Sequence, residues 1–345
     1  MRGKMSSMRE WLQLGLLGCL GLLGGWRSLT AQEPNASADQ QHLQLLQLLN
    51  AIEPYHPTGE LRGQAVLAGS NTMLHLGQSW SERFRLFHPQ VELERGVDGS
   101  DAGLEALAKD PNTIVGVSRQ VTEEDLAKLK SGACKEPVVL IVALDPLAVY
   151  VHKDNPLPGL TPAQVRQLFA ADAAGKPAVA SWKELGVSGA LALQPVRVHH
   201  RSQVSGTRNF IKQSVLDGAN LAEPAATHSS NLEICKAIAA DTAGVGMCGF
   251  GDRTEGVRAV PLILNEQKVE ASEAAFLAGQ YPLVRPLSLV FDKSLLKRDQ
   301  GLREAMVRYI LSRDGQAEAI RAGFYPLDPN FIRQEIVQLT GTQIR

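Results

Sequence analysis

Short apolar segments alternate with amphipathic segments along most of the chain, and turns rich in Gly, Ser and Thr join them. From residue 66 to the helix that opens at Thr122, the order strand, turn, helix recurs three times, with short strands at 66–67, 91–95 and 114–118. In the helix predicted over 74–87, apolar residues recur at helical spacing. Repeated strand–turn–helix units predict an α/β fold in which helices flank a mostly parallel sheet.

The second half continues this alternation. The apolar stretch 138–151 predicts a buried strand that crosses between two lobes. Thr122 and Thr161 are predicted N-caps of helices, and a further helix is expected over 231–240. A strand follows at 245–250, the segment 257–264 is expected to carry the chain back to the first lobe, and a later strand is expected at 287–291. The remainder predicts helices over 294–312 and 315–322 and an irregular exit at 324–327.

These elements predict two lobes, the second inserted in the first. Lobe 1 is expected to comprise 63–150 and 252–345, because the segment 257–264 would return the chain to it. Lobe 2 is expected to comprise 151–251. The segment 32–62 is predicted to be a linker with a short leader helix outside the core fold.

The N-terminus carries basic residues and then a short, glycine-broken apolar run over 11–26. This pattern is typical of a secretory signal peptide, predicted over 1–31 with cleavage near Ala31. The protein is therefore expected to be periplasmic or secreted. The run Leu16–Cys19 resembles a lipoprotein box, but apolar residues continue past Cys19, so lipid anchoring is the less favoured alternative.

Composition and net charge limit the kinds of partner that the protein is expected to have. A chain of 345 residues with 44% hydrophobic and 21% charged residues fits an ordinary soluble protein of two domains. Its formal net charge of −1 gives no indication of nucleic acid or a membrane surface as partner. No C-x-x-C or His-x-x-x-His spacing supports a metal site, and no cofactor is expected.

The stretch 198–212 is crowded with hydrogen-bond donors, which are the hydroxyls of Ser202, Ser205 and Thr207, the backbone N–H of Gly206, and the guanidiniums of Arg201 and Arg208. It reads as a strand end, a tight turn and a helix that begins near Thr207. Free N–H groups at a helix start and a planar arginine fork attract oxyanions. Two interpretations stay open here: an oxyanion site, or an N-capped helix with solvated arginines.

Cys134, Cys235 and Cys248 remain after removal of the signal peptide. Export into an oxidising compartment allows one disulfide. Cys235 and Cys248 lie 13 positions apart, on a predicted helix and a predicted strand, and are the favoured pair. Cys134 would then be a buried free thiol.

Several motifs together resemble the periplasmic phosphate-binding proteins of ABC transporters, within the type II periplasmic binding protein superfamily. They include A-G-S-N-T-M, G-S-D-A-G, G-V-S-R, L-T-P-A-Q-V, S-W-K-E-L-G, R-S-Q-V-S-G-T, A-G-V-G-M and Q-Y-P-L-V-R-P-L, in this order between 66 and 327. The resemblance implies two lobes that close on a dehydrated tetrahedral oxyanion.

By that resemblance, Thr72 and Met73 stand at the first anion-contacting turn and Ser100 at the second, while Arg201, Ser205, Gly206 and Thr207 match the anion loop. Two departures concern the carboxylate that accepts a phosphate proton in the best-known members. Arg119 stands at its position, and Gln203 replaces a residue that is often acidic. Asp98 or Asp101 would have to turn inward instead. Arg119 is interpreted as a second anion clamp, with a structural pairing to Glu123 as the alternative.

An enzyme is not expected, because no Gly-x-Ser-x-Gly elbow is present and Ser294 with Lys297 lacks partner motifs. Of His199 and His200, one is expected to face the core and the other solvent. The sequence thus predicts a monomeric exported receptor for an inorganic oxyanion, most simply phosphate, that delivers it to an ABC permease. The alternative is a sensor or partner-binding protein of the same fold.

Overall fold

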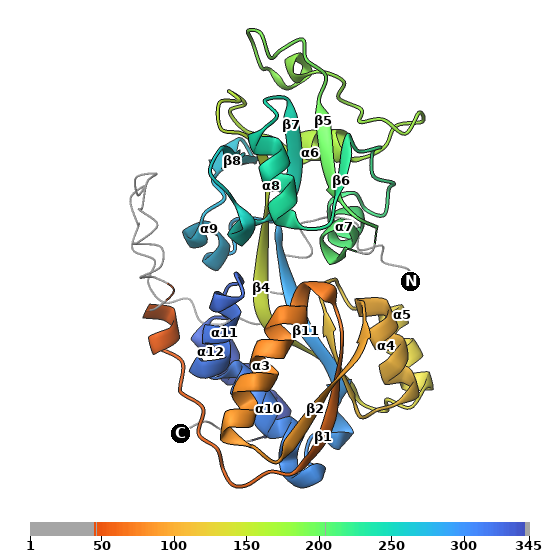
Figure 1. Ribbon diagram of the computed structural model, residues 1–345, viewed down its shortest axis with the longest axis vertical. Coiled ribbons are helices and arrows are strands. Elements are labelled where there is room, and N and C mark those ends of the chain that lie inside the picture. The colour runs from red at the N-terminus through yellow and green to blue at the C-terminus, as the bar shows by residue number, and fades with distance from the viewer. Residues whose placement is uncertain (1–44, 46, 204, 342–345) are drawn as a thin grey trace. The chain divides into compact units, whose positions relative to one another are not determined.

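The computed structural model describes residues 45, 47–203 and 205–341. The predicted signal peptide, Cys19 and Ala31 lie outside this part of the chain. The described residues form two compact units, one made of Asp145–Arg285 and the other of the residues up to Leu144 together with those from Pro286 onward. The chain thus passes from one unit to the other between Leu144 and Asp145 and returns between Arg285 and Pro286 (Figure 1).

The unit made of the described residues up to Leu144 and from Pro286 onward, called here the terminal unit, is built on a mixed sheet. Its strand order is β2-β1-β3-β11-β4, with β1 parallel to β2 and β3 and with β11 antiparallel to β3. The strands are β1 (Gly63–Gly69), β2 (Val91–Asp98), β3 (Thr113–Val117), β4 (Pro137–His152) and β11 (Val284–Asp292). The helices are α3 (Leu74–Phe87), α4 (Ser100–Lys109), α5 (Glu123–Ser131), α10 (Leu302–Leu311), α11 (Arg313–Arg321) and α12 (Pro329–Thr340).

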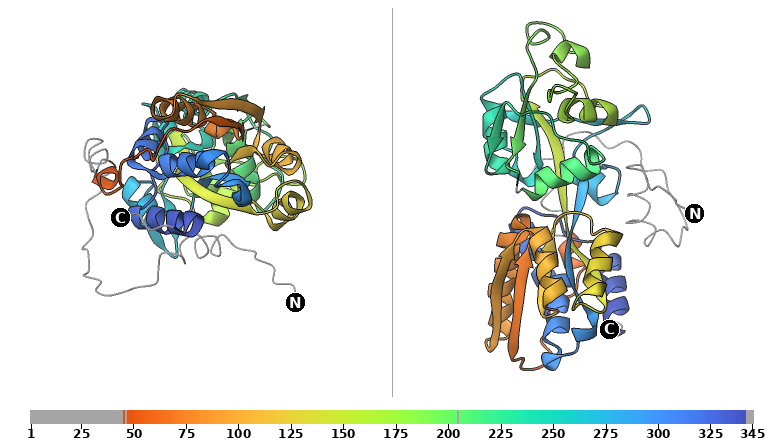
Figure 2. Two further views of the ribbon diagram at one scale, coloured as in Figure 1. Left: turned by 90° about the horizontal axis from the view of Figure 1, so that it is seen from below. Right: turned by 90° about the vertical axis from the view of Figure 1, so that its right-hand side faces the viewer.

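Helices cover both faces of this sheet (Figure 2). Successive residues of a strand point to opposite faces. In β3, Ile114 accordingly joins the larger apolar core beneath α3, α10, α11 and α12, whereas Val115 and Val117 join the smaller core beneath α4 and α5. The α/β fold with a mostly parallel sheet between helices is therefore confirmed for this unit.

The inserted unit contains a second sheet of order β4-β7-β5-β6, with β8 paired to β4. β5 (Arg197–Arg201) runs parallel to β6 (Ala226–His228) and β7 (Gly244–Gly249), and β4 runs antiparallel to β7 and β8 (Val257–Ala259). The other elements are α6 (Pro162–Phe169), α7 (Gly206–Phe210), α8 (Asn231–Ala239), α9 (Glu273–Leu277) and the hairpin β9 (Leu262–Leu264) with β10 (Gln267–Val269).

The short helical turns are η1 (Asn71–Met73), η2 (Trp182–Leu185), η4 (Phe250–Asp252), η5 (Lys293–Leu295) and η6 (Asp299–Gly301), and a π-helical turn, η3 (Ile211–Val215), follows α7. The predicted caps are present: Thr122 and Thr161 each form a capping box with the side chain three residues later. Among the described residues, no helix combines the length and the apolarity needed to cross a bilayer.

The lobe boundaries differ from those predicted. The segment expected to return the chain to the first lobe instead stays in the inserted unit, where Val257, Arg258 and Ala259 pair with His152, Val151 and Tyr150. The inserted unit therefore ends at Arg285, not at residue 251. Tertiary contacts decide which strand so short a segment pairs with, and the local sequence pattern does not show these contacts.

The segment before β1 is not a separate linker. Leu49, Ile52 and Tyr55 lie in the core of the terminal unit, each 8% exposed or less. Tyr55 also packs edge-on against Tyr309 of α10 at 5.5 Å between ring centroids. The apolar face of the leader helix is thus part of the fold.

The C-terminal region departs from prediction at two points. The helix expected over 294–312 begins only at Leu302, because Gln300 (φ 58°) and Gly301 (φ 84°) adopt left-handed conformations that a helix cannot contain. Beyond the expected exit, α12 follows, capped by Asp328 and opened by Pro329. Its Ile332 and Ile336 close the large core.

Candidate functional site

Three serines meet at one edge of the sheet of the terminal unit. Ser70 follows β1, Ser118 follows β3, and Ser100 opens α4. The Ser70 hydroxyl donates to Ser118 Oγ at 2.7 Å, and the Ser118 backbone N–H points at Ser100 Oγ at 3.4 Å. Ser70 and Ser118 are buried. Turns that carry hydroxyl groups therefore converge at the carboxyl ends of strands of this unit.

Glycines bring these turns together. Gly69 has φ +111°, and a side chain there would lie 2.2 Å from the carbonyl oxygen of Gly116 on β3. A side chain on Gly103 of α4 would lie 2.8 Å from the Cα of Gly69. Only glycine permits so close an approach of the helix to the strand end. The glycines of the A-G-S and G-S-D-A-G motifs thus both permit the same close contact between the end of β1 and α4.

The two residues of the first predicted turn differ in their environment. Thr72 is half-buried, and its backbone N–H donates to Ser70 Oγ. The backbone N–H of Met73 donates to the Ser70 carbonyl at 3.0 Å, and its side chain is buried against Gly116. Met73 has neither an amide nor a side chain available for a ligand, so the structure removes it from the predicted site. Thr72 stays a candidate.

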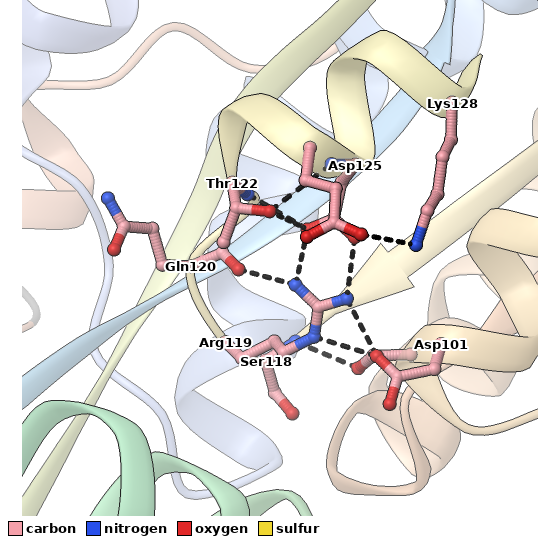
Figure 3. Close-up of polar contacts among 9 residues, drawn as sticks. Asp101, Ser118, Arg119, Gln120, Thr122, Asp125 and Lys128 are labelled. Carbon is pink, nitrogen blue, oxygen red and sulfur yellow. Dashed lines mark hydrogen bonds and ion pairs between the residues drawn. The ribbon is translucent and has the colours of Figure 1, made fainter. Parts of the chain in front are cut away.

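Arg119 is held by two carboxylates (Figure 3). Its Nε and Nη2 contact Asp101 Oδ1 at 2.8 and 2.6 Å, its Nη1 and Nη2 donate to Asp125 at 2.6 and 3.1 Å, and Nη1 also donates to the Gln120 carbonyl. A guanidinium has five N–H groups, and these contacts occupy all five. The geometry therefore favours the structural alternative to the anion clamp, with Asp101 and Asp125 as partners in place of Glu123.

Asp98 and Asp101, one of which would have to turn inward to accept a phosphate proton, both pair with arginines. Asp101 pairs with Arg119, and Asp98 receives three hydrogen bonds from the exposed Arg95. Burial acts to raise the pKa of Asp125, but the hydrogen bonds from Arg119 and Thr122 outweigh it and hold that pKa below its usual value. These three carboxylates are thus engaged by cations of their own unit.

The predicted anion loop lies in the inserted unit, between β5 and α7. Ser205 is the N-cap of α7, and its side chain accepts from the Arg208 N–H at 3.4 Å. Ser205 is 4% exposed and Thr207 is 1% exposed, while Gly206 is half-buried at the first helical position. The helix begins one residue before the predicted Thr207 and soon becomes π-helical.

Arg201 lies at the end of β5, beside this loop. Its Nη1 donates to Asn231 Oδ1 at 3.0 Å, and Asn231 in turn donates to Asp252 at 2.9 Å. Its Nε is buried with no hydrogen-bond partner among the described residues. Burial lowers the pKa of Arg201, and the nearby charge of Arg285 adds to this, whereas Asp252 opposes it. A buried N–H without an acceptor is costly, and an oxyanion is one acceptor that would satisfy it.

The residues around Arg201 were missed by the sequence patterns. Asn231 and Asp252 were passed over because short polar side chains at a helix start and after a strand carry no distinctive signal. Burial raises the pKa of Asp252. Arg285 and Asp145 form a buried ion pair at 2.6 Å, and Arg285 Nη2 also donates to Thr207 Oγ1 at 3.2 Å. The Q-Y-P-L-V-R-P-L motif contained Arg285, but nothing in it indicated a contact with the anion loop.

Cys235 of α8 and Cys248 of β7 are neighbours, with their Sγ atoms 3.1 Å apart and both side chains fully buried. They are unbonded here, so their pairing as a disulfide stays a prediction. Cys134 is a buried free thiol whose pKa burial raises to about 12. Within the described part of the chain, no group of three or more potential ligands could hold a metal ion.

Both histidines of β5 are buried, which corrects the expectation that one of them faces solvent. His199 is 7% exposed and contacts His228 at 3.1 Å between ring nitrogens. His200 is 2% exposed, and its ring lies 5.8 Å from that of Phe169. Because β5 is a central strand, covered on both faces, the alternation rule for half-exposed strands does not apply to it.

We expect His200 to make the protein sensitive to acid. Burial, followed by the charge of Arg208, lowers its pKa from 6.5 to about 3. Between these values the unfolded chain binds a proton that the folded chain rejects. Stability is therefore complete above pH 6.5 and is lost as the pH falls, by up to about 1.4 kcal/mol per unit. Urea denaturation between pH 7 and 4 should show a flatter dependence in His200→Leu, whereas His75→Gln, on the exposed side of α3, should match the wild type. An unchanged slope in His200→Leu would contradict this assignment.

The comparison that decides the family is a match over most of the chain. The family model described as the PBP superfamily domain matches residues 55–314, well over half of the sequence. The chain belongs to the PBP superfamily. This membership and the α/β architecture confirm the resemblance predicted from the motifs.

Among other members, the chain is similar to the phosphate-binding protein PstS of Pseudomonas aeruginosa, with 29% identity over 293 residues, 84% of this chain and 91% of that protein. It is 27% identical over 268 residues to the phosphate-binding protein PstS of Bacillus subtilis, covering 77% of this chain and 81% of that one. It is also 23% identical over 290 residues to protein SphX of Synechococcus elongatus, with 83% and 84% covered.

Two solved structures share the fold. A possible phosphate binding protein from Planctomyces limnophilus aligns with a TM-score of 0.65 at 21% identity, over 81% of this chain and all of that one. An ABC-type phosphate transport receptor from Vibrio cholerae aligns with a TM-score of 0.63 at 21% identity, over 77% of this chain and all of that one. At this identity the likeness concerns the fold alone.

Proposed function

We propose that the protein is an exported receptor for an inorganic oxyanion, phosphate, and that it delivers the anion to an ABC permease. The observation that carries this proposal is Arg201, whose buried Nε lacks a partner among the described residues and which ends β5, just before the loop that carries Ser205 and Thr207. The similarity to proteins named as phosphate-binding supports it. The proposed ligands are Thr72 and Ser100 of the terminal unit and Arg201, Ser205, Gly206 and Thr207 of the inserted unit.

The remaining parts of the proposal follow from this function. Residues 1–31 act as a signal peptide, the mature protein is periplasmic or secreted, and it binds as a monomer without cofactor or catalysis. Intact mass of the protein purified from the producing cell tests the cleavage site near Ala31. A mass that includes residues 1–31, or a lipid on Cys19, would overturn this part alone.

The function itself is tested by calorimetric titration of ligand-stripped protein with phosphate and then sulfate, across pH 5 to 8. A buried acceptor in the site would reject sulfate, which carries no proton to donate. Tight binding of phosphate with rejection of sulfate would establish a phosphate receptor. Comparable binding of sulfate would establish a general oxyanion site. No binding of either anion would overturn the proposal in favour of a sensor or partner-binding role.

Arg119→Ala is expected to leave phosphate affinity unchanged within about twofold, because every N–H of Arg119 is used inside its own unit. Loss of its hydrogen bonds to the largely buried Asp125 should lower the free energy of unfolding by about 1–3 kcal/mol. The matched variant Arg95→Ala removes an exposed pair and should lower the free energy of unfolding less than Arg119→Ala does. Calorimetry and urea denaturation measure both effects, and a tenfold loss of affinity in Arg119→Ala would restore the anion clamp.

A further inference from the structure

Arg285 is a buried cation beside the proposed anion loop. It is 1% exposed, and its Nε and Nη2 both donate to Asp145 Oδ2, at 2.8 and 2.6 Å. Its guanidinium carbon also lies 5.9 Å from the centre of the Phe210 ring on α7. Contacts on two sides fix the orientation of the planar guanidinium.

In this orientation Arg285 reaches the loop through Thr207. Its Nη2 donates to Thr207 Oγ1 at 3.2 Å, although the two residues lie 78 positions apart. A threonine hydroxyl has one proton to donate and lone pairs that accept. Because Arg285 occupies the accepting side, the hydroxyl proton must point elsewhere. No hydrogen bond within the described part of the chain uses that proton, and Thr207 is 1% exposed.

The charges around the loop support a role in anion binding. Burial lowers the pKa of Arg201, and the charge of Arg285 acts in the same direction. A negative ligand at the loop would relieve this repulsion. Asp145 pairs with Arg285 and has no hydrogen bond to Thr207 within the described part of the chain.

We propose that Arg285 is a positioning residue of the anion site, which orients the Thr207 hydroxyl so that it donates its proton to a bound oxyanion. A hydroxyl that accepts a hydrogen bond from a cation is polarised and donates more strongly. Arg285 therefore acts through Thr207 without contacting the ligand. This inference rests on the proposed function, whose failure is recognised separately, by wild-type protein that does not bind phosphate.

A double-mutant cycle on phosphate affinity tests the proposal. Arg285→Gln is combined with Asp145→Asn, so that no unpaired carboxylate stays buried. This variant and Thr207→Val should each weaken phosphate binding by about 10- to 100-fold, as expected for a charge-assisted hydrogen bond. The combined protein should bind no more than about threefold more weakly than Thr207→Val, because both changes remove one donor. Multiplicative losses would overturn the proposal. Arg285→Lys, which keeps a charged donor, should recover part of the affinity.

A second pair in the same unit supplies the control. Arg197 forms a similar ion pair with Asp241 at the opposite end of β5. Arg197→Gln with Asp241→Asn should leave phosphate affinity unchanged. If the Arg285 variants do not fold, Thr207→Ser and Thr207→Val decide instead, since Arg285 stays in place in both. Thr207→Ser, which keeps the hydroxyl, should bind phosphate more tightly than Thr207→Val, and equal losses in the two would overturn the proposal.

Discussion

Replacing Arg201 with alanine is expected to weaken phosphate binding by about 30-fold or more, as for truncation of one partner of a buried charge pair. The guanidinium is the one unsatisfied cation of the proposed loop among the described residues, and its Nε has no acceptor. The folded protein should not lose stability, because burial already disfavours the charge of Arg201 in the free state and lowers its pKa. Calorimetry gives the affinity, and urea denaturation without ligand gives the stability.

Arg197 provides the matched control for this experiment. It lies on the same strand, four residues before Arg201, but its guanidinium already pairs with Asp241. Arg197→Ala should retain wild-type affinity. Retained affinity in Arg201→Ala would remove the proposed anion loop, and a loss in both variants would indicate a general effect on β5.

Oxidation of Cys235 and Cys248 to a disulfide is the second large effect we expect. Their sulfurs are neighbours, and the proposed compartment is oxidising. A bond that closes a loop of about this length stabilises the folded state by about 3 kcal/mol in the chain-entropy account. Protein purified without reductant and then denatured should therefore contain two cysteines that do not react with a thiol reagent. Reduction before heating should lower the midpoint temperature of its thermal unfolding.

Variants distinguish the stabilising effect of this disulfide from that of side-chain packing. Cys235→Ala with Cys248→Ala should melt at the lower temperature with or without reductant. Cys134→Ala should keep the reductant-dependent shift, because Cys134 is isolated in the other unit. Three freely titrating thiols in the unreduced, denatured mature protein, those of Cys134, Cys235 and Cys248, would show that the pair stays reduced.

Local signals in the sequence predicted the helices well. Thr122 and Thr161 each bring a capping partner three residues later, and the apolar spacing of α3 gave both of its ends. Such elements are determined by residues close in the chain. The motif order likewise predicted the family.

The errors arose where distant residues decide the outcome. Arg119 was interpreted as a clamp because its partner Asp101 lies 18 positions earlier, on another helix. Leu49 and Ile52 were assigned to a linker because their packing partners come from the far end of the chain. Arg285 was not predicted as a neighbour of the anion loop for the same reason. Sequence patterns report local geometry, whereas these contacts depend on tertiary packing.

The Asp145–Arg285 pair has a consequence for modularity. These two residues are the first and last of the inserted unit, and their side chains are in direct contact. The Leu147 backbone N–H also donates to the Leu283 carbonyl at 2.7 Å. An insertion whose entrance and exit are adjacent can be exchanged with little disturbance of its host. The stretch 145–285 should therefore behave as a cassette: grafted into a relative at the same two points, it would carry its arginine-bearing loop with it.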